Sequence, residues 1–256
     1  MITGIFDSHA HYDDPAFDPD REQLLQALPQ QGVSLVLNAG CDMQSSHAGI
    51  ALGKQFAHVY SSVGVHPLAA QEITRQTLDT LAELAQQPKV CAIGEIGLDY
   101  HYDSVPREIQ LSAFEQQLAL AKELDMPVII HSREASNDTV QLLKKYRPRG
   151  IVHCFSGSVE MAKEILRLDM YIGFTGVLTF KNARRAVEAA ASIPADRLLL
   201  ETDCPYMAPE PLRGKRCDSS MLQYTAARLA QIKETDPQQM AEQTFRNACA
   251  VYGIDR

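Results

Sequence analysis

The sequence has no surplus of positive charge. Its 24 lysines and arginines stand against 32 aspartates and glutamates, which gives a formal net charge of −8 and a pI near 5.5. This balance argues against a protein coated in basic surface for binding nucleic acid or anionic membranes. It is compatible with a phosphate substrate, because bound divalent metal ions add positive charge at the place where the substrate binds.

The chain also lacks long apolar runs and closely spaced cysteines. Ionisable residues and glycines interrupt every apolar stretch before membrane-spanning length, and no basic segment followed by an apolar run opens the chain. The six cysteines form no Cys-x-x-Cys pair, so we expect reduced thiols rather than a disulfide framework. We therefore expect a cytoplasmic protein without a signal peptide or a membrane partner, and nothing in the sequence indicates a stable protein partner.

A Gly-x-Gly-x-x-Gly turn after an early strand is missing, as are low-complexity segments, linkers and repeats. The missing turn weakens the case for a doubly wound open sheet, which is the competing fold. What the chain has is eight short apolar runs, each followed by a longer amphipathic segment. The runs lie at residues 2–6, 33–38, 59–65, 90–93, 128–130, 150–152, 170–175 and 198–200.

We expect helices between and after these runs, at residues 18–31, 43–56, 76–86, 106–124, 136–146, 159–168, 182–192, 219–233 and 237–251. The runs are continuously apolar, as in parallel strands that are buried on both faces. Eight strand–helix units of about 32 residues each are typical of a (β/α)8 barrel. The pattern predicts an α/β TIM barrel, with residues 1–256 as a single domain.

Polar residues follow the ends of five of the eight runs. The first run leads into His9 and His11, which project from the same face if the strand continues through them. Later runs lead, within one to three residues, to Glu95, His131, His153 and Asp203. Each alone would be an ordinary strand-end or loop residue. In a barrel, however, the carboxyl ends of all strands converge on one face, so together these residues predict a metal site there.

Four imidazoles and two carboxylates are too many ligands for one tetrahedral ion. They suit two divalent ions about 3.5–4 Å apart that share a carboxylate, and Glu95 is the natural bridge. Such a pair activates a water and polarises a phosphoryl or carbonyl oxygen, so the predicted chemistry is hydrolysis. Asp203 is the expected general base. We expect Asp7, Asp99 and Glu201 to orient the metal ligands rather than to bind metal.

The motifs that contain these residues closely resemble those of the TatD-type metal-dependent deoxyribonucleases, a family of the amidohydrolase-like superfamily of metal barrels. The resemblance covers nearly the whole chain. Its motifs are, in order, His9-x-His11, Gly64-Val65-His66-Pro67, Gly94-Glu95-Ile96-Gly97-Leu98-Asp99-Tyr100, His131-Ser132-Arg133, His153-Cys154-Phe155-Ser156-Gly157 and Glu201-Thr202-Asp203-Cys204-Pro205-Tyr206.

The resemblance implies a ligand set for each ion: one would be held by His9, His11, Glu95 and Asp203, and the other by Glu95, His131 and His153. His66 and Arg133 match positions near the substrate phosphate. The family is described as cytoplasmic nucleases with 3′–5′ exonuclease activity on DNA and roles in DNA repair or degradation. Magnesium, manganese or zinc would be the metal.

One loop departs from the family pattern. After Leu212-Arg213-Gly214-Lys215-Arg216 the family usually continues with Asn-Glu-Pro, whereas this chain continues with Cys217-Asp218-Ser219-Ser220. We expect this loop to border the substrate, so the departure puts the inherited substrate preference in doubt. Arg213 and Lys215 are candidates for phosphate contacts; the alternative is a solvated basic loop.

The leading hypothesis is a two-metal phosphodiesterase that acts on single-stranded DNA or on frayed DNA ends. A second hypothesis keeps the site but assigns it a small-molecule phosphate ester, or an ester or amide such as an aminoacyl nucleotide. Many related barrels carry a modified lysine after the fourth strand, and Glu95 at that position favours the nuclease-like branch. A third hypothesis is a metal-binding protein without turnover, which a missing ligand or base would favour; neither is missing.

Overall fold

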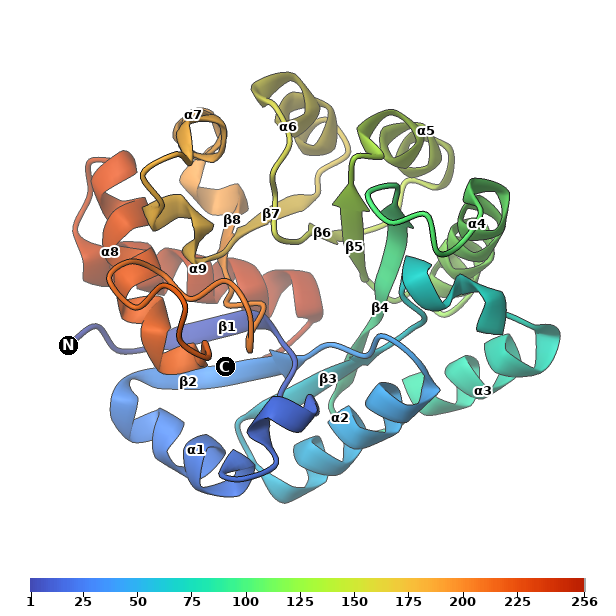
Figure 1. Cartoon of the computed structure of the whole chain (residues 1–256), viewed down its shortest axis with the longest axis horizontal. Coiled ribbons are helices and arrows are strands. Elements are labelled where there is room, and N and C mark those ends of the chain that lie inside the picture. Colours follow the sequence, from blue (N-terminus) through green and yellow to red (C-terminus); the bar gives the residue numbers. More distant parts are fainter. Residues whose placement is uncertain (256) are drawn as a thin grey trace.

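The computed structural model describes residues 1–255, and it contains eight parallel strands that pair in sequence order from β1 to β8 (Figure 1). The strands are β1 (Ile5–Ala10), β2 (Val33–Asn38), β3 (Val59–Val63), β4 (Val90–Asp99), β5 (Val128–Arg133), β6 (Gly150–Val152), β7 (Tyr171–Phe174) and β8 (Leu198–Leu200). This arrangement confirms the prediction of an eight-stranded α/β barrel.

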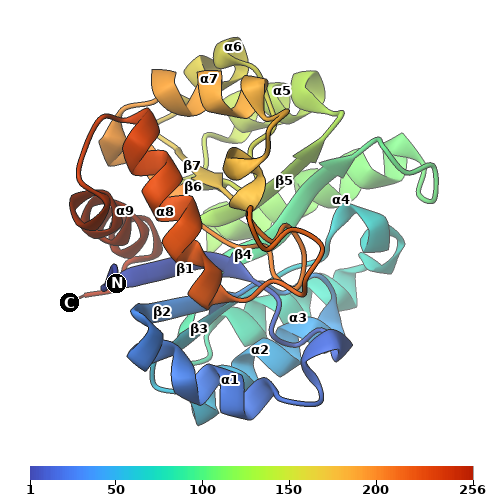
Figure 2. The same ribbon diagram turned by 60° about the vertical axis from the view of Figure 1, so that its left-hand side comes forward.

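Helices surround the strands as an outer ring (Figures 1 and 2). They are α1 (Arg21–Ala27), α2 (Met43–Gln55), α3 (Arg75–Ala85), α4 (Arg107–Glu123), α5 (Ser136–Tyr146), α6 (Val159–Leu166), α7 (Arg184–Ser192), α8 (Leu222–Ile232) and α9 (Pro237–Tyr252). Short 3-10 turns lie at Pro15–Phe17, Leu28–Gln31, Pro67–Glu72, Gly176–Thr179, Ala195–Arg197 and Ser219–Met221. No helix within residues 1–255 combines the length and the apolar character that a membrane span requires.

Apolar side chains fill the barrel because strands that are covered on both sides are buried at most positions. Phe6, Leu35 and Ile129, which lie near the starts of their strands, form one buried cluster with Val251 and Tyr252 of α9. The terminal helix therefore packs against the amino-terminal part of the barrel interior, which leaves the opposite end for the polar residues.

The ring closes between β1 and the segment that follows β8. The backbone amide of Asp203 donates to the carbonyl of His9 over 3.0 Å, and the amide of His11 donates to the carbonyl of Cys204 over 2.9 Å. The Ser8 hydroxyl adds a bond of 3.0 Å to the carbonyl of Leu200. These bonds fix the two predicted site segments 9–11 and 203–204 side by side.

Several polar residues that we expected beyond the strands lie inside them. β1 extends through His9, β4 continues through Glu95 to Asp99, and β5 includes His131. The predicted strands ended too early because they were drawn from apolar residues alone, whereas these polar side chains lie within the strands and pack against one another. All eight residues of β4 from Ala92 to Asp99 are buried.

The expected helix at residues 18–31 is also shorter in the structure. α1 ends at Ala27, and a 3-10 turn with Pro29 follows, because proline has no amide hydrogen to continue the helix. The turn ends at Gly32, whose φ is +88° and whose position leaves no room for a Cβ, which would lie 2.2 Å from the carbonyl oxygen of Ile2. The six cysteines are all free thiols, as expected.

Candidate metal centre

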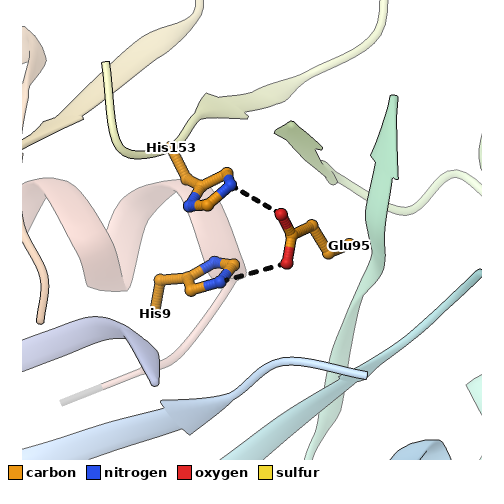
Figure 3. A group of neighbouring side chains, drawn as sticks. All are labelled: His9, Glu95 and His153. Carbon is orange, nitrogen blue, oxygen red and sulfur yellow. Dashed lines mark ion pairs between the residues drawn. The ribbon is translucent and has the colours of Figure 1, made fainter. Parts of the chain in front are cut away.

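The centre of the polar cluster is Glu95, whose carboxylate is almost fully buried on β4. Figure 3 shows the carboxylate between the rings of His9 and His153, with one oxygen turned toward each ring. The distances are 3.4 Å from Oε2 to Nε2 of His9 and 2.7 Å from Oε1 to Nε2 of His153. One carboxylate thus has two separate groups of neighbours.

The Oε1 side of Glu95 faces imidazoles from three further strands or strand ends. Nδ1 of His131 lies 2.7 Å from Oε1, and Nε2 of His153 lies at the same distance. These two nitrogens are 3.2 Å apart. Nε2 of His66 is 3.7 Å from Oε1. The ring nitrogens of three histidines therefore converge on a single oxygen.

The Oε2 side faces the closing seam of the barrel. Nε2 of His11 lies 3.7 Å from Oε2 and 3.0 Å from Nε2 of His9. Oδ1 of Asp203 is 3.3 Å from Nε2 of His11 and 3.6 Å from Nε2 of His9. The structure thus brings all six predicted ligands together and divides the other five between the two oxygens of Glu95.

The donor atoms fit divalent cations. Zinc accepts both ring nitrogens and carboxylate oxygens from proteins, and carboxylate oxygens also suit manganese and magnesium. The Nε2 atoms of His9 and His11 face each other at 3.0 Å, and Nδ1 of His131 lies 3.2 Å from Nε2 of His153. These mutually facing nitrogens are more favourable with a cation between them than as a set of neutral imidazoles.

The protonation states of the rings differ: burial favours the neutral form of two of them, and carboxylates favour the protonated form of the others. Burial alone would raise the pKa of Glu95, but the charges of His153, His66 and His9 lower it well below 4.5. Burial lowers the pKa values of His9 and His66 to about 4, so both rings are neutral near pH 7. Burial also acts to lower the pKa of His131, yet its bonds to Asp99 and Glu95 raise it to about 9.

Asp99 and Glu201, expected to orient ligands, lie beside two of the histidines. Oδ2 of Asp99 is 3.1 Å from Nε2 of His131 and thus holds that ring with Nδ1 toward Glu95. Glu201 accepts a bond from the amide of Cys154, next to His153, and its other carboxylate oxygen has no partner. Burial raises the pKa of Glu201 to about 8.

Asp7 does not reach the side chains of the cluster. It accepts bonds from the amide and the hydroxyl of Thr202, at 2.9 and 2.6 Å, and from the hydroxyl of Ser219 at 2.6 Å. Thr202 precedes Asp203, whose φ is +59°, a strained value for a residue that is not glycine. Asp7 therefore holds the backbone that presents Asp203.

A cavity of about 810 Å³ opens above the cluster. His11, Glu95, His131, His153 and Asp203 line its floor, and two predicted substrate contacts, His66 and Arg133, line it as well. The other two predicted contacts lie outside this lining: Arg213 stacks on the ring of Phe180 at 4.4 Å, and Lys215 is exposed in the following loop.

The departing loop does not border the cavity, contrary to expectation. Cys217 and Ser219 are buried beside Asp7 and Tyr12, and the Ser219 hydroxyl lies 2.7 Å from the Tyr12 hydroxyl. Arg216 is tied to Asp20 by two bonds of 2.7 and 2.6 Å. The sequence places this segment after β8, but its packing turns it under the rim of the barrel rather than toward the cavity.

Cys41 is a residue of the site that the sequence analysis did not single out. Its Sγ lies 3.5 Å from Oε2 of Glu95 and 3.8 Å from Nδ1 of His11, and the residue lines the cavity. The three side chains form one of the groups whose ligand atoms lie within 4.8 Å of one another. Cys41 follows the run at 33–38 by three residues, which is the distance at which Asp203 follows the run at 198–200. This spacing is the signal in the sequence that could have identified Cys41.

The comparisons with known proteins agree with this geometry. A family profile described as TatD related DNase matches residues 6–253. The uncharacterized metal-dependent hydrolase YabD of Bacillus subtilis is 39% identical over 254 residues, which cover 98% of this chain and 100% of YabD. The 3′-5′ ssDNA/RNA exonuclease TatD of Erwinia amylovora is 34% identical over 259 residues, covering 98% of this chain and 100% of the relative.

A solved structure shares the whole architecture. The crystal structure of YjjV, a TatD homolog from Escherichia coli K12, superposes with a TM-score of 0.93 at 30% identity, and the match covers 100% of both chains. The resemblance seen in the motifs thus extends to sequence and fold over the full length. This chain therefore belongs to the TatD-related DNase family, within the amidohydrolase-like superfamily, and is a metal-dependent hydrolase.

Proposed function

We propose that this protein is a 3′–5′ exodeoxyribonuclease that uses two divalent ions to hydrolyse phosphodiester bonds at the end of a single strand. One observation carries the proposal: five ligand-type side chains are divided between the two oxygens of a sixth, Glu95, at the floor of an open cavity. Family relatives named as 3′-5′ ssDNA/RNA exonucleases support the choice of substrate.

In this proposal the ligands are those implied by the grouping around Glu95. His9, His11, Asp203 and Glu95 would hold one ion, and Glu95, His131 and His153 would hold the other. Magnesium, manganese or zinc, when bound, supplies the positive charge that activates a water and stabilises the phosphoryl oxygens.

The chain's own residues complete the chemistry. Asp203, whose carboxylate is 16% exposed at the cavity floor, accepts the proton of the attacking water. His66 and Arg133, which line the same cavity, bind the non-bridging oxygens of the phosphate. Glu95 fixes the two groups of ligands relative to each other, because one group contacts its Oε1 and the other its Oε2.

The rim of the cavity suits a single strand. Tyr102 and Tyr206 line the cavity and expose 47% and 58% of their surface, so their rings are available to stack on unpaired bases. The reactive groups lie at the floor, which a strand end reaches more easily than the middle of a duplex. The acidic net charge of −8 leaves the phosphate contacts to these few local groups.

The test uses single-stranded oligodeoxynucleotides that carry a label at the 3′ or at the 5′ end, with magnesium, manganese or zinc added to metal-stripped protein. We expect the 3′ label to be released as mononucleotide first and the 5′-labelled strand to shorten progressively. Full-length strands at every metal, with no change on adding EDTA, would refute the proposal. Turnover of an aminoacyl nucleotide or a small phosphate ester in a parallel panel, without turnover of DNA, would assign the site to that substrate class instead.

A further inference from the structure

A second, smaller cavity of about 240 Å³ opens beside the main one, far larger than the ~10–15 Å³ that one water needs. We call it the side pocket, and its polar lining is formed by Ser132, Arg133, Glu134, Ser136, Ser156 and Arg185. Ser132, Arg133, Phe155 and Ser156 line the main cavity too, so the two spaces adjoin. A molecule bound over the Glu95 cluster can therefore extend into the side pocket.

Two arginines, Arg133 and Arg185, give the side pocket its positive charge. Within residues 1–255 neither Arg133 nor Arg185 forms an ion pair. The Arg133 guanidinium lies over the ring of Tyr102 at 5.1 Å and donates one bond to its hydroxyl, which leaves its other donors available. Arg184, next in the chain to Arg185, is different: its Nε bonds Glu188 at 2.8 Å, and it is not part of the lining.

Neutral donors accompany the two guanidinium groups. The hydroxyls of Ser136 and Ser156 line the pocket at exposed positions, and the Ser132 hydroxyl lies 2.9 Å from that of Thr139. Ser136 is also the first residue of α5, whose preceding residue, Ala135, provides no side-chain cap for the first-turn amides. Such amides favour a negatively charged ligand.

One acidic residue, Glu134, belongs to the lining and another, Glu160, lies near Arg185, and each is bonded to a residue outside the lining. Oε1 of Glu134 lies 2.7 Å from Nδ1 of His101, on the neighbouring loop. Glu160 is bonded by Ser158, which is the first cause of its lowered pKa, and Arg185 contributes to that lowering only through its charge. The side pocket therefore offers two arginine forks and several hydroxyls to an anion, and such forks match the geometry of phosphate oxygens.

We propose that the side pocket binds a second phosphate group of the substrate strand, next to the one that is cleaved. This inference rests on the proposed function, because it places a longer nucleic-acid strand across the two adjoining cavities. Arg185 would be the distinguishing residue, since it lines the side pocket alone, whereas Arg133 lines both cavities. The pocket would make the enzyme prefer substrates with at least two phosphates over those with one.

The experiment compares the trimer TpTpT, which has two internal phosphates, with the dimer TpT, which has one, and with pTpT, whose second phosphate is terminal. We expect Arg185→Ala to lower the ratio of kcat/KM for TpTpT to that for TpT by about tenfold, which corresponds to about 1.4 kcal/mol. Arg184→Ala is the matched control, because it removes the same charge from the same helix outside the pocket. A loss with TpTpT alone identifies an internal phosphodiester as the ligand, and an equal loss with pTpT identifies any second phosphate.

A binding measurement separates this inference from the proposed function. Fluorescence anisotropy of dye-labelled TpTpT on metal-free protein in EDTA should show weaker binding for Arg185→Ala than for Arg184→Ala, and Arg185→Lys should recover part of the affinity. Equal affinities and equal kcat/KM ratios for the Ala variants overturn the side pocket while leaving the exonuclease proposal intact. If the wild type cleaves no DNA, the exonuclease proposal fails, and the anisotropy comparison alone decides the pocket.

Discussion

Asp99 lies behind the ring of His131: its Oδ2 is 3.1 Å from Nε2, while Nδ1 on the other side of the ring points at Glu95 from 2.7 Å. A carboxylate in this position fixes the orientation of the imidazole and strengthens it as a ligand. Asp99→Asn should therefore weaken metal binding roughly 10–100-fold, the range found for such supporting residues. Competition with a chelating dye measures this, and Asp103→Asn, at an exposed position in the following loop, is the control. Equal affinities for the two variants would count against the assignment.

Glu95 has neighbours on both sides, so removing its charge should disturb both halves of the site. In the wild type we expect divalent metal to raise the melting temperature. The added free energy of unfolding should be about 2.7 kcal/mol at a free metal concentration 100 times Kd. EDTA should reverse this increase. Glu95→Gln should lose most of the increase and retain less metal after gel filtration, as measured by elemental analysis. A full increase with two ions bound would contradict the bridging role.

Asp203 is the expected proton acceptor as well as a neighbour of His9 and His11. Asp203→Asn keeps the size of the side chain but removes its basicity, so kcat should fall by about 10²–10⁴, the usual contribution of a general base. Far-ultraviolet circular dichroism should show the native fold. An activity within a factor of about two of the wild type at saturating metal would assign the base elsewhere.

Ser219 stands in the loop that departs from the family pattern, and it binds Asp7 at 2.6 Å and Tyr12 at 2.7 Å in a buried setting. Ser219→Ala would leave these partners incompletely paired, at a cost of about 1–3 kcal/mol in the free energy of unfolding. Urea denaturation measures it, with Ser220→Ala, in the same turn but only partly buried, as the milder control. If both variants lose the same free energy of unfolding, the bonds from Ser219 to Asp7 and Tyr12 do not stabilise the closure of the barrel.

The pair of Asp20 and Arg216 predicts a pH dependence. The bonds from Arg216 lower the pKa of Asp20 below 3.8, so its stabilising contribution is present above the unfolded pKa and is lost as pH falls through the lower, folded pKa. The melting temperature of Asp20→Asn should lie below that of the wild type by a constant amount between about pH 5 and pH 8. The difference should shrink below about pH 4, and a difference that instead grew on acidification would refute the pairing.

Much of the fold follows from local sequence pattern. Eight apolar runs, each followed by an amphipathic segment, predicted the parallel barrel because continuous apolar runs of that length suit strands buried on both faces. Their order also placed Glu95, His131 and Asp203 on one rim. The ends of the strands were less predictable: β4 continues to Asp99. A pattern of apolar residues cannot register a buried carboxylate whose partners come from other strands.

The residue types of the candidate site, the strand on which or after which each of them lies and the family of the chain could all be predicted from the order of the amino acids. The position of Cys41 in the cluster, the burial of the loop around Ser219 and the place of Arg185 in the lining of a second cavity could not. The physical reason is that these features depend on contacts between distant segments. Asp7 and Thr202, for example, are 195 positions apart in the chain. Their hydrogen bonds hold Asp203 beside His9 and His11, which lie near the amino terminus. His9 and His11 join the other residues of the candidate metal centre only when the barrel closes between β1 and β8.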